Sequence, residues 1–126
     1  MDSILTLLNQ YGIEDPVPED TVGVYNNSIL MDLYTDLVAQ GQLSLVDALE
    51  VGGYIEEMDI LDIQRFIANS DHPDVIAVYE RLMMGSRNHL RAFVGALSGE
   101  GVTYVPVLMD EAEYQAIISS PIEGGP

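Results

Sequence analysis

The sequence contains no cysteine and no lysine, and it has only two histidines in 126 residues. Without cysteine, the protein forms no disulfide, binds no zinc through thiolates and has no cysteine nucleophile. Serine-hydrolase chemistry also lacks its elbow motif here, and no glycine-rich phosphate loop follows a strand. These absences exclude most of the common catalytic classes.

Basic residues are scarce. Acidic residues number 21 against four basic ones, which gives a formal net charge of −17. The four basic residues are all arginines: Arg65, Arg81, Arg87 and Arg91. A field of this sign repels phosphate backbones and attracts metal cations or a basic partner, so we expect no nucleic-acid binding. A solubilising surface, or adaptation to high salt, explains the same charge without a ligand.

Long apolar runs are missing as well. No stretch approaches the roughly 18 residues that a membrane span needs, so we expect no membrane insertion. The first residues lack the basic region and apolar core of a signal peptide. A cytoplasmic protein is the default expectation, and a protein whose leader has been removed fits equally well. The hydrophobic fraction of 48% is enough for one core, which predicts a single domain over residues 1–126.

Helical periodicity dominates the chain and predicts an all-α fold. Apolar residues recur at helical spacing in four stretches, namely residues 2–11, 28–40, 45–68 and 73–98. The third and fourth stretches are long and closely linked, so we expect them to form an antiparallel pair. Residues 99–126 read as a C-terminal arm that contains a short helix over 110–118, and residues 123–126 are expected to fray.

Two glycines interrupt the third helix. Gly52 and Gly53 lie mid-helix, where each glycine costs roughly 1 kcal/mol relative to alanine. Close approach of a neighbouring helix is the natural compensation. Because the fourth helix is the expected neighbour, the glycine pair predicts tight packing between these two helices.

The third and fourth helices also carry the candidate chemistry. Glu56, Glu57 and Asp59 lie on or beside the apolar stripe of the third helix, and His89 lies on that of the fourth. Metal sites in helical bundles combine carboxylates from facing helices with a Glu-x-x-His step one turn long. Here Ser86 occupies the glutamate position of that step, so the pattern predicts a metal site that is degenerate.

Two simpler interpretations remain open. The acidic residues of the third helix pair with Arg87 and Arg91 across the helix pair, as surface ion pairs worth about 0–1 kcal/mol. Alternatively, His89 is a core histidine that bonds to a carbonyl or a carboxylate. Spacing alone does not choose between these interpretations and a metal site.

The sequence also resembles a known family. Residues 48–63 (ALEVGGYIEEMDILDI) and 78–93 (VYERLMMGSRNHLRAF), together with residues 11–16 and 101–104, are similar to an uncharacterised family of microbial ferritin-like proteins. The match falls in the C-terminal two-thirds of that family. The segment GSRNHLRAF is the most specific part of the resemblance.

The resemblance implies a ferritin-like four-helix bundle that is truncated at its N-terminus, without the first helix and most of the second. It further implies that iron or manganese binds in the bundle, with Glu56 or Glu57 and His89 as ligands. Half of the family's ligands are missing: either the sequence is a fragment, or its start is truncated, or a second chain supplies the missing wall. Two exposed helices with apolar stripes favour self-association, which predicts a homo-oligomer such as a dimer. The alternative is a non-enzymatic acidic interaction module that has kept the bundle and lost the site.

Overall fold

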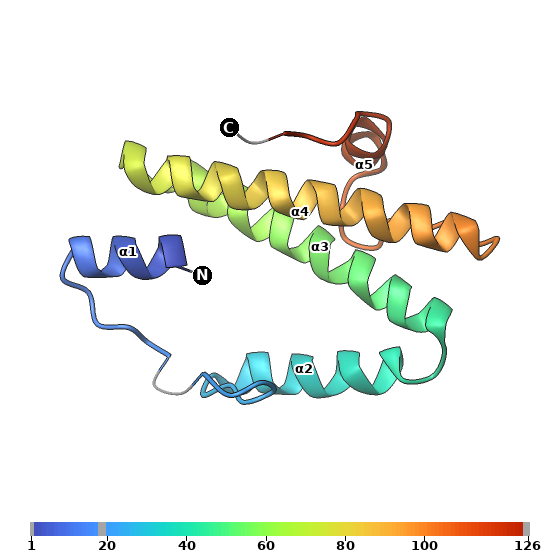
Figure 1. The fold of residues 1–126 in the computed structure, drawn as a ribbon, viewed down its shortest axis with the longest axis horizontal. Helices are drawn as coiled ribbons and strands as arrows, with labels where there is room; N and C mark the ends of the chain where they lie inside the picture. The colour runs from blue at the N-terminus through green and yellow to red at the C-terminus, as the bar shows by residue number, and fades with distance from the viewer. Residues whose placement is uncertain (1, 18–19, 125–126) are drawn as a thin grey trace. The chain divides into compact units, whose positions relative to one another are not determined.

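The computed structural model describes residues 2–17 and 20–124. These residues form helices joined by irregular segments, and none of them is in a strand (Figure 1). The described residues form α1 (Asp2–Gln10), α2 (Ser28–Gly41), α3 (Leu45–Ala68), α4 (Pro73–Gly99) and α5 (Glu111–Ile118). The all-α prediction is therefore confirmed. Each observed boundary lies within one residue of the boundary that periodicity and capping predict.

The chain divides into two compact units, Met1–Ala39 and Gln40–Pro126, where composition predicts a single domain over residues 1–126. The first unit contains α1 and most of α2, and none of its described residues is buried. Its helices are nevertheless well delimited. Gly12 adopts a φ of 64° after α1, and the Asn27 side chain caps α2 by accepting bonds from the amides of Ile29 and Leu30.

The second unit is built on α3 and α4, which run antiparallel and side by side, with α5 packed on α4 (Figure 1). Ser44 caps α3 by accepting a 3.0 Å bond from the amide of Asp47, as its sequence predicts. Asp110 caps α5 in the same way. The core of this unit consists of Ile60, Met83, Leu90, Leu97, Tyr104, Met109, Tyr114 and Ile117.

The glycine pair of α3 allows two close approaches. A Cβ atom on Gly52 would lie 2.3 Å from the ring of Phe93 on α4, and one on Gly53 would lie 2.8 Å from the ring of Tyr104. The first contact confirms the predicted approach of α4. The second is made by the extended segment that follows α4, which the spacing did not predict.

The C-terminal segment is docked against α4. Glu123, which the sequence places in a fraying tail, forms ion pairs and backbone hydrogen bonds with residues of α4. The prediction of fraying is therefore wrong for this residue, because specific polar contacts offset the entropy of ordering the segment. Gly125 and Pro126, included in the same prediction, lie outside the described residues. Within the described chain, no helix is both long enough and apolar enough to cross a membrane.

Candidate functional site

Glu56 and Glu57 are adjacent in sequence but face different partners. Successive helical residues are about 100° apart, so each glutamate shares its face with the residue four positions earlier. Gly52 and Glu56 face α4, where they meet Phe93 and His89. Glu57 instead lies on the face of Gly53, towards the segment that follows α4. The sequence left the two glutamates as alternatives, and the structure separates them.

The Glu57 carboxylate is fully buried and anchors that segment. It accepts hydrogen bonds from the amides of Val107, Leu108 and Met109 at 3.0, 3.0 and 2.8 Å, and one from the Tyr104 hydroxyl. Charge-assisted bonds of this kind are the strongest that neutral donors make. The Glu57 carboxylate therefore holds residues 104–109 against α3.

Glu56 and His89 lie together at the interface of α3 and α4. The Nδ1 atom of His89 is 3.2 Å from Oε1 of Glu56, and the two side chains are 67% and 11% exposed. The other carboxylate oxygen, Oε2, is buried and has no hydrogen-bond partner among the described residues. Ser86, one turn before His89, is buried beside this pair. The site is thus a buried carboxylate with an open acceptor, next to a histidine that reaches solvent.

Burial raises the pKa values of the acids at this site. For Glu56, the charge of His89 opposes this rise, the charge of Asp59 adds to it, and side-chain hydrogen bonds with Ser86 and His89 oppose it. Partial desolvation and the charge of Asp62 raise the pKa of Asp59, although its side chain lies at the surface. A cation placed among these groups would therefore be attracted, because it would relieve the cost of their charged forms.

A metal ion needs more donors than this site supplies. Among residues 2–17 and 20–124, no three His, Asp or Glu side chains are placed to hold one ion together. Glu56 and His89 provide one oxygen and one nitrogen donor, which suit iron or manganese but satisfy only part of their coordination. The donor types fit such an ion, and the number of donors corresponds to a partial site.

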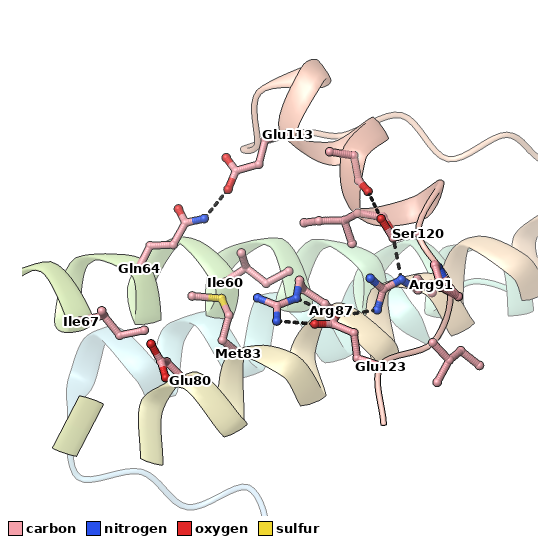
Figure 2. Close-up of a pocket in the computed structure, with 14 residues that line it drawn as sticks. Ile60, Gln64, Ile67, Glu80, Met83, Arg87, Arg91, Glu113, Ser120 and Glu123 are labelled. Atoms are coloured by element: carbon pink, nitrogen blue, oxygen red, sulfur yellow. Dashed lines mark hydrogen bonds and ion pairs between the residues drawn. The ribbon is translucent and has the colours of Figure 1, made fainter. Parts of the chain in front are cut away.

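One interpretation of the sequence pairs Arg87 and Arg91 with the carboxylates of α3. The structure contradicts that interpretation. Both arginines bind Glu123 instead (Figure 2). Nε and Nη2 of Arg87 donate to the two oxygens of Glu123 at 2.7 and 2.6 Å, and Nη1 of Arg91 donates to one of them at 3.0 Å. These bonds lower the pKa of Glu123 to about 2, and the largest contribution comes from the hydrogen bond with Arg87.

A cavity of about 940 Å³ lies beside these arginines, between α3, α4, α5 and the C-terminal segment. Figure 2 shows Ile60 and Met83 along it, with Glu113 and Gln64 hydrogen-bonded at one end and the Arg87–Glu123–Arg91 cluster at the other. The cavity lies entirely within the second unit.

Sequence reasoning missed Tyr104 and Glu123 as partners of the central helices. Tyr104 is 47 residues from Glu57, and Glu123 is 36 residues from Arg87. The one signal for Tyr104 was Gly53, four residues before Glu57, because a second glycine next to Gly52 needs a second close neighbour. The segment around Glu123 carried no comparable signal.

These features define an all-α protein in which an antiparallel helix pair carries a glutamate–histidine pair and an arginine-bound tail. The chain belongs to the family described as uncharacterized protein domain DUF2202, which matches residues 1–121. It is 47% identical over 125 residues to the uncharacterized protein MJ0754 of Methanocaldococcus jannaschii, covering 99% of this chain and 68% of that protein. The crystal structure of hypothetical protein MJ0754 from the same species superposes with a TM-score of 0.95, over 98% of this chain and 70% of that one.

Proposed function

We propose that this protein is a ferritin-like, metal-associated protein in which Glu56 and His89 form part of a site for iron or manganese. The observation that carries the proposal is the open acceptor. Oε2 of Glu56 is buried without a hydrogen-bond partner among the described residues, beside the imidazole of His89. An unpaired buried carboxylate oxygen is costly, and a bound cation is one way to remove that cost.

In this proposal Glu56 supplies an oxygen ligand and His89 supplies Nδ1, which requires the neutral imidazole. Glu57, the other glutamate that the family resemblance implies, supports the site by fixing the segment that packs on α3. The remaining ligands come from a second copy of the chain, because the described residues of one chain do not complete the site. A bound iron or manganese ion supplies Lewis acidity or electron transfer, and the helix pair positions it.

Metal content of the purified chain tests the proposal. We expect the double variant Glu56→Gln, His89→Asn to retain its helical circular dichroism and to lose most of the iron or manganese bound per chain, as measured by elemental analysis. The variant Glu111→Gln, His72→Asn removes the same residue types elsewhere and is expected to keep the metal. Equal metal content in wild type and the first variant would rule the proposal out.

A second candidate function is a non-enzymatic acidic interaction module. Three observations favour it: His89 is 67% exposed, Ser86 stands where a Glu-x-x-His step would have its glutamate, and no three metal-ligating side chains converge among the described residues. In that case the −17 charge recruits a basic partner. Elemental analysis distinguishes the two functions, because the interaction module would contain no stoichiometric metal in any variant.

Self-association accompanies either function. The first unit leaves large apolar side chains in water, among them Val22, Ile29 and Leu30 at 95%, 75% and 48% exposure. Apolar surface of this extent, on a unit whose described residues include none that is buried, favours coverage by another chain. We propose a homodimer, in which the second copy covers these side chains.

A further inference from the structure

We propose that α4 and the adjoining cavity form a binding site for an amphipathic monocarboxylate, and that the chain's own Glu123 occupies the carboxylate position of this site. The proposed site comprises Arg87, Asn88 and Arg91, together with the apolar floor of the cavity. It is separate from the Glu56–His89 pair and does not depend on the function proposed above.

The arginines form a carboxylate receptor. Nε and Nη2 of Arg87 hold the two oxygens of Glu123 in the bidentate geometry that guanidinium and carboxylate groups share (Figure 2). Nη1 of Arg91 reaches the same carboxylate at 3.0 Å. Two of the four cations in a chain of net charge −17 thus converge on one anion.

Within this receptor, Arg91 is held in place by groups other than Glu123. The Arg91 side chain is only 10% exposed, and it donates from Nε to the carbonyl of Ile117 and from Nη1 to Oδ1 of Asn88, at 2.9 and 2.8 Å. The side-chain amide of Asn88 in turn donates to the backbone carbonyl of Glu123 and accepts from the backbone N–H of Glu123. Because Arg91 keeps two partners when the tail leaves, its orientation survives exchange of the carboxylate.

An apolar channel leads away from the receptor. The cavity measures about 940 Å³, near the upper end of the 300–1,000 Å³ typical of small-molecule sites. Ile60, Ile67 and Met83 line it between the arginines and the far end. A carboxylate held by Arg87 would therefore direct an attached hydrocarbon chain over apolar side chains.

Acidic residues at the far end of the cavity limit the class of ligand that fits. Glu80 and Glu113 line that region, so a second anionic group on the ligand would meet like charges. An uncharged chain avoids this repulsion. The chemistry that fits both ends is a single carboxylate with an apolar tail.

Such a ligand competes with a tethered carboxylate. Because Glu123 is part of the same chain, its effective concentration at the arginines is in the millimolar range, as for short flexible linkers. A short acid such as acetate offers only a carboxylate. It therefore cannot displace the Glu123 carboxylate at concentrations below the effective concentration of Glu123. An acid with a longer apolar chain adds burial in the cavity, and its affinity rises with each methylene.

Octanoate binding, followed by amide chemical-shift titration of the whole chain, tests the proposal. We expect octanoate to bind the wild type, Glu123→Gln to bind it at least tenfold more tightly, and Arg87→Gln in the Glu123→Gln background to lose that gain. Octanamide, which has the same chain without the charge, is expected to show no gain in the Glu123→Gln variant. Acetate is expected to bind far more weakly than octanoate.

Matched variants control for net charge and folding. Glu100→Gln removes the same charge at an exposed position at the end of α4 and is expected to leave the octanoate affinity unchanged. Arg65→Gln, outside the cavity, is the corresponding control for Arg87→Gln. Equal octanoate affinity in the wild type, Glu123→Gln and the arginine variant would mean apolar adsorption only and would overturn the proposal. So would the absence of octanoate binding to Glu123→Gln at millimolar concentration.

Discussion

Glu56 and Glu57 show how two identical neighbouring residues acquire opposite roles. Glu57 has all its bonding capacity used by three amides and a hydroxyl, so it stabilises the fold as a carboxylate. Glu56 pairs on one oxygen with His89 and keeps the other open. The difference follows from the 100° step between them, which turns one towards the segment after α4 and the other towards α4 itself.

Substitution of Glu57 by glutamine should therefore be costly. The amide group keeps the size of the side chain but turns one acceptor oxygen into an N–H donor, which then faces the buried donors of Tyr104 and Val107. We expect the free energy of unfolding to fall by about 3 kcal/mol, measured by urea denaturation at pH 7. Chymotryptic cleavage after Tyr104 should accelerate in parallel, because the loosened segment becomes accessible to the protease.

Glu56→Gln is the matched control, because it makes the same chemical change one position away. Burial raises the pKa of Glu56, so a neutral side chain is tolerated there, and the ion pair that is lost involves an exposed histidine. We expect a loss below about 1 kcal/mol. Equal losses for the two variants would contradict the assignment of Glu57 as the anchoring residue.

At the level of elements, the close packing of α3 against α4 depends on the absence of a side chain at Gly52. Gly52 brings no side chain to the interface, and the Phe93 ring fills the space. The energetic cost of a mid-helix glycine is thus offset by packing between helices, as the sequence pattern predicted. Gly53 serves the same purpose towards Tyr104.

Alanine substitutions at two glycines of this helix pair should have opposite signs. In Gly52→Ala the new Cβ would lie 2.3 Å from Phe93, and we expect a loss of about 1–3 kcal/mol from overpacking. In Gly85→Ala, on α4, the new Cβ meets nothing within 4 Å, so we expect a gain of about 0.5–1 kcal/mol from helix propensity. Thermal unfolding followed by circular dichroism measures both. A gain for Gly52→Ala would show that the two helices are not closely packed at this position.

For the whole molecule, Glu123 attaches the C-terminal segment to the middle of α4. The Arg87 bonds lower the pKa of Glu123 from 4.5 to about 2, so its ionised form is favoured in the folded state. By linkage, the stability that it contributes is fully present above pH 4.5 and is lost as the pH falls towards about 2.

This linkage predicts a pH-dependent difference between the wild type and Glu123→Gln. Above about pH 5 the variant should be less stable by a constant amount, and below pH 4.5 the two stabilities should converge, because only the wild type has a carboxylate at position 123 to protonate. Urea denaturation across this pH range measures the difference. A difference that stays constant down to pH 2.5 would mean that the arginine contacts do not stabilise the folded state through the ionised carboxylate.

The first unit makes a prediction about assembly. We expect light scattering to give a mass near twice 13.8 kDa for the wild type and a shift towards the monomer in Ile29→Asp, which places a charge on an apolar side chain that is 75% exposed. Thr35→Asp adds the same charge on α2 and should leave the mass unchanged. A folded wild-type monomer at micromolar concentration would contradict the proposed dimer.

The sequence by itself determined the helices of this protein, because helix formation, capping and termination depend on residues within about one turn of each other. Asn27, Ser44 and Asp110, for example, cap their helices by accepting from amides only two or three residues away. Only the tertiary structure decided that Glu57 bonds to Tyr104 and that Glu123 occupies the two arginines. These contacts join residues 47 and 36 positions apart, and such partners are selected by the packing of whole elements.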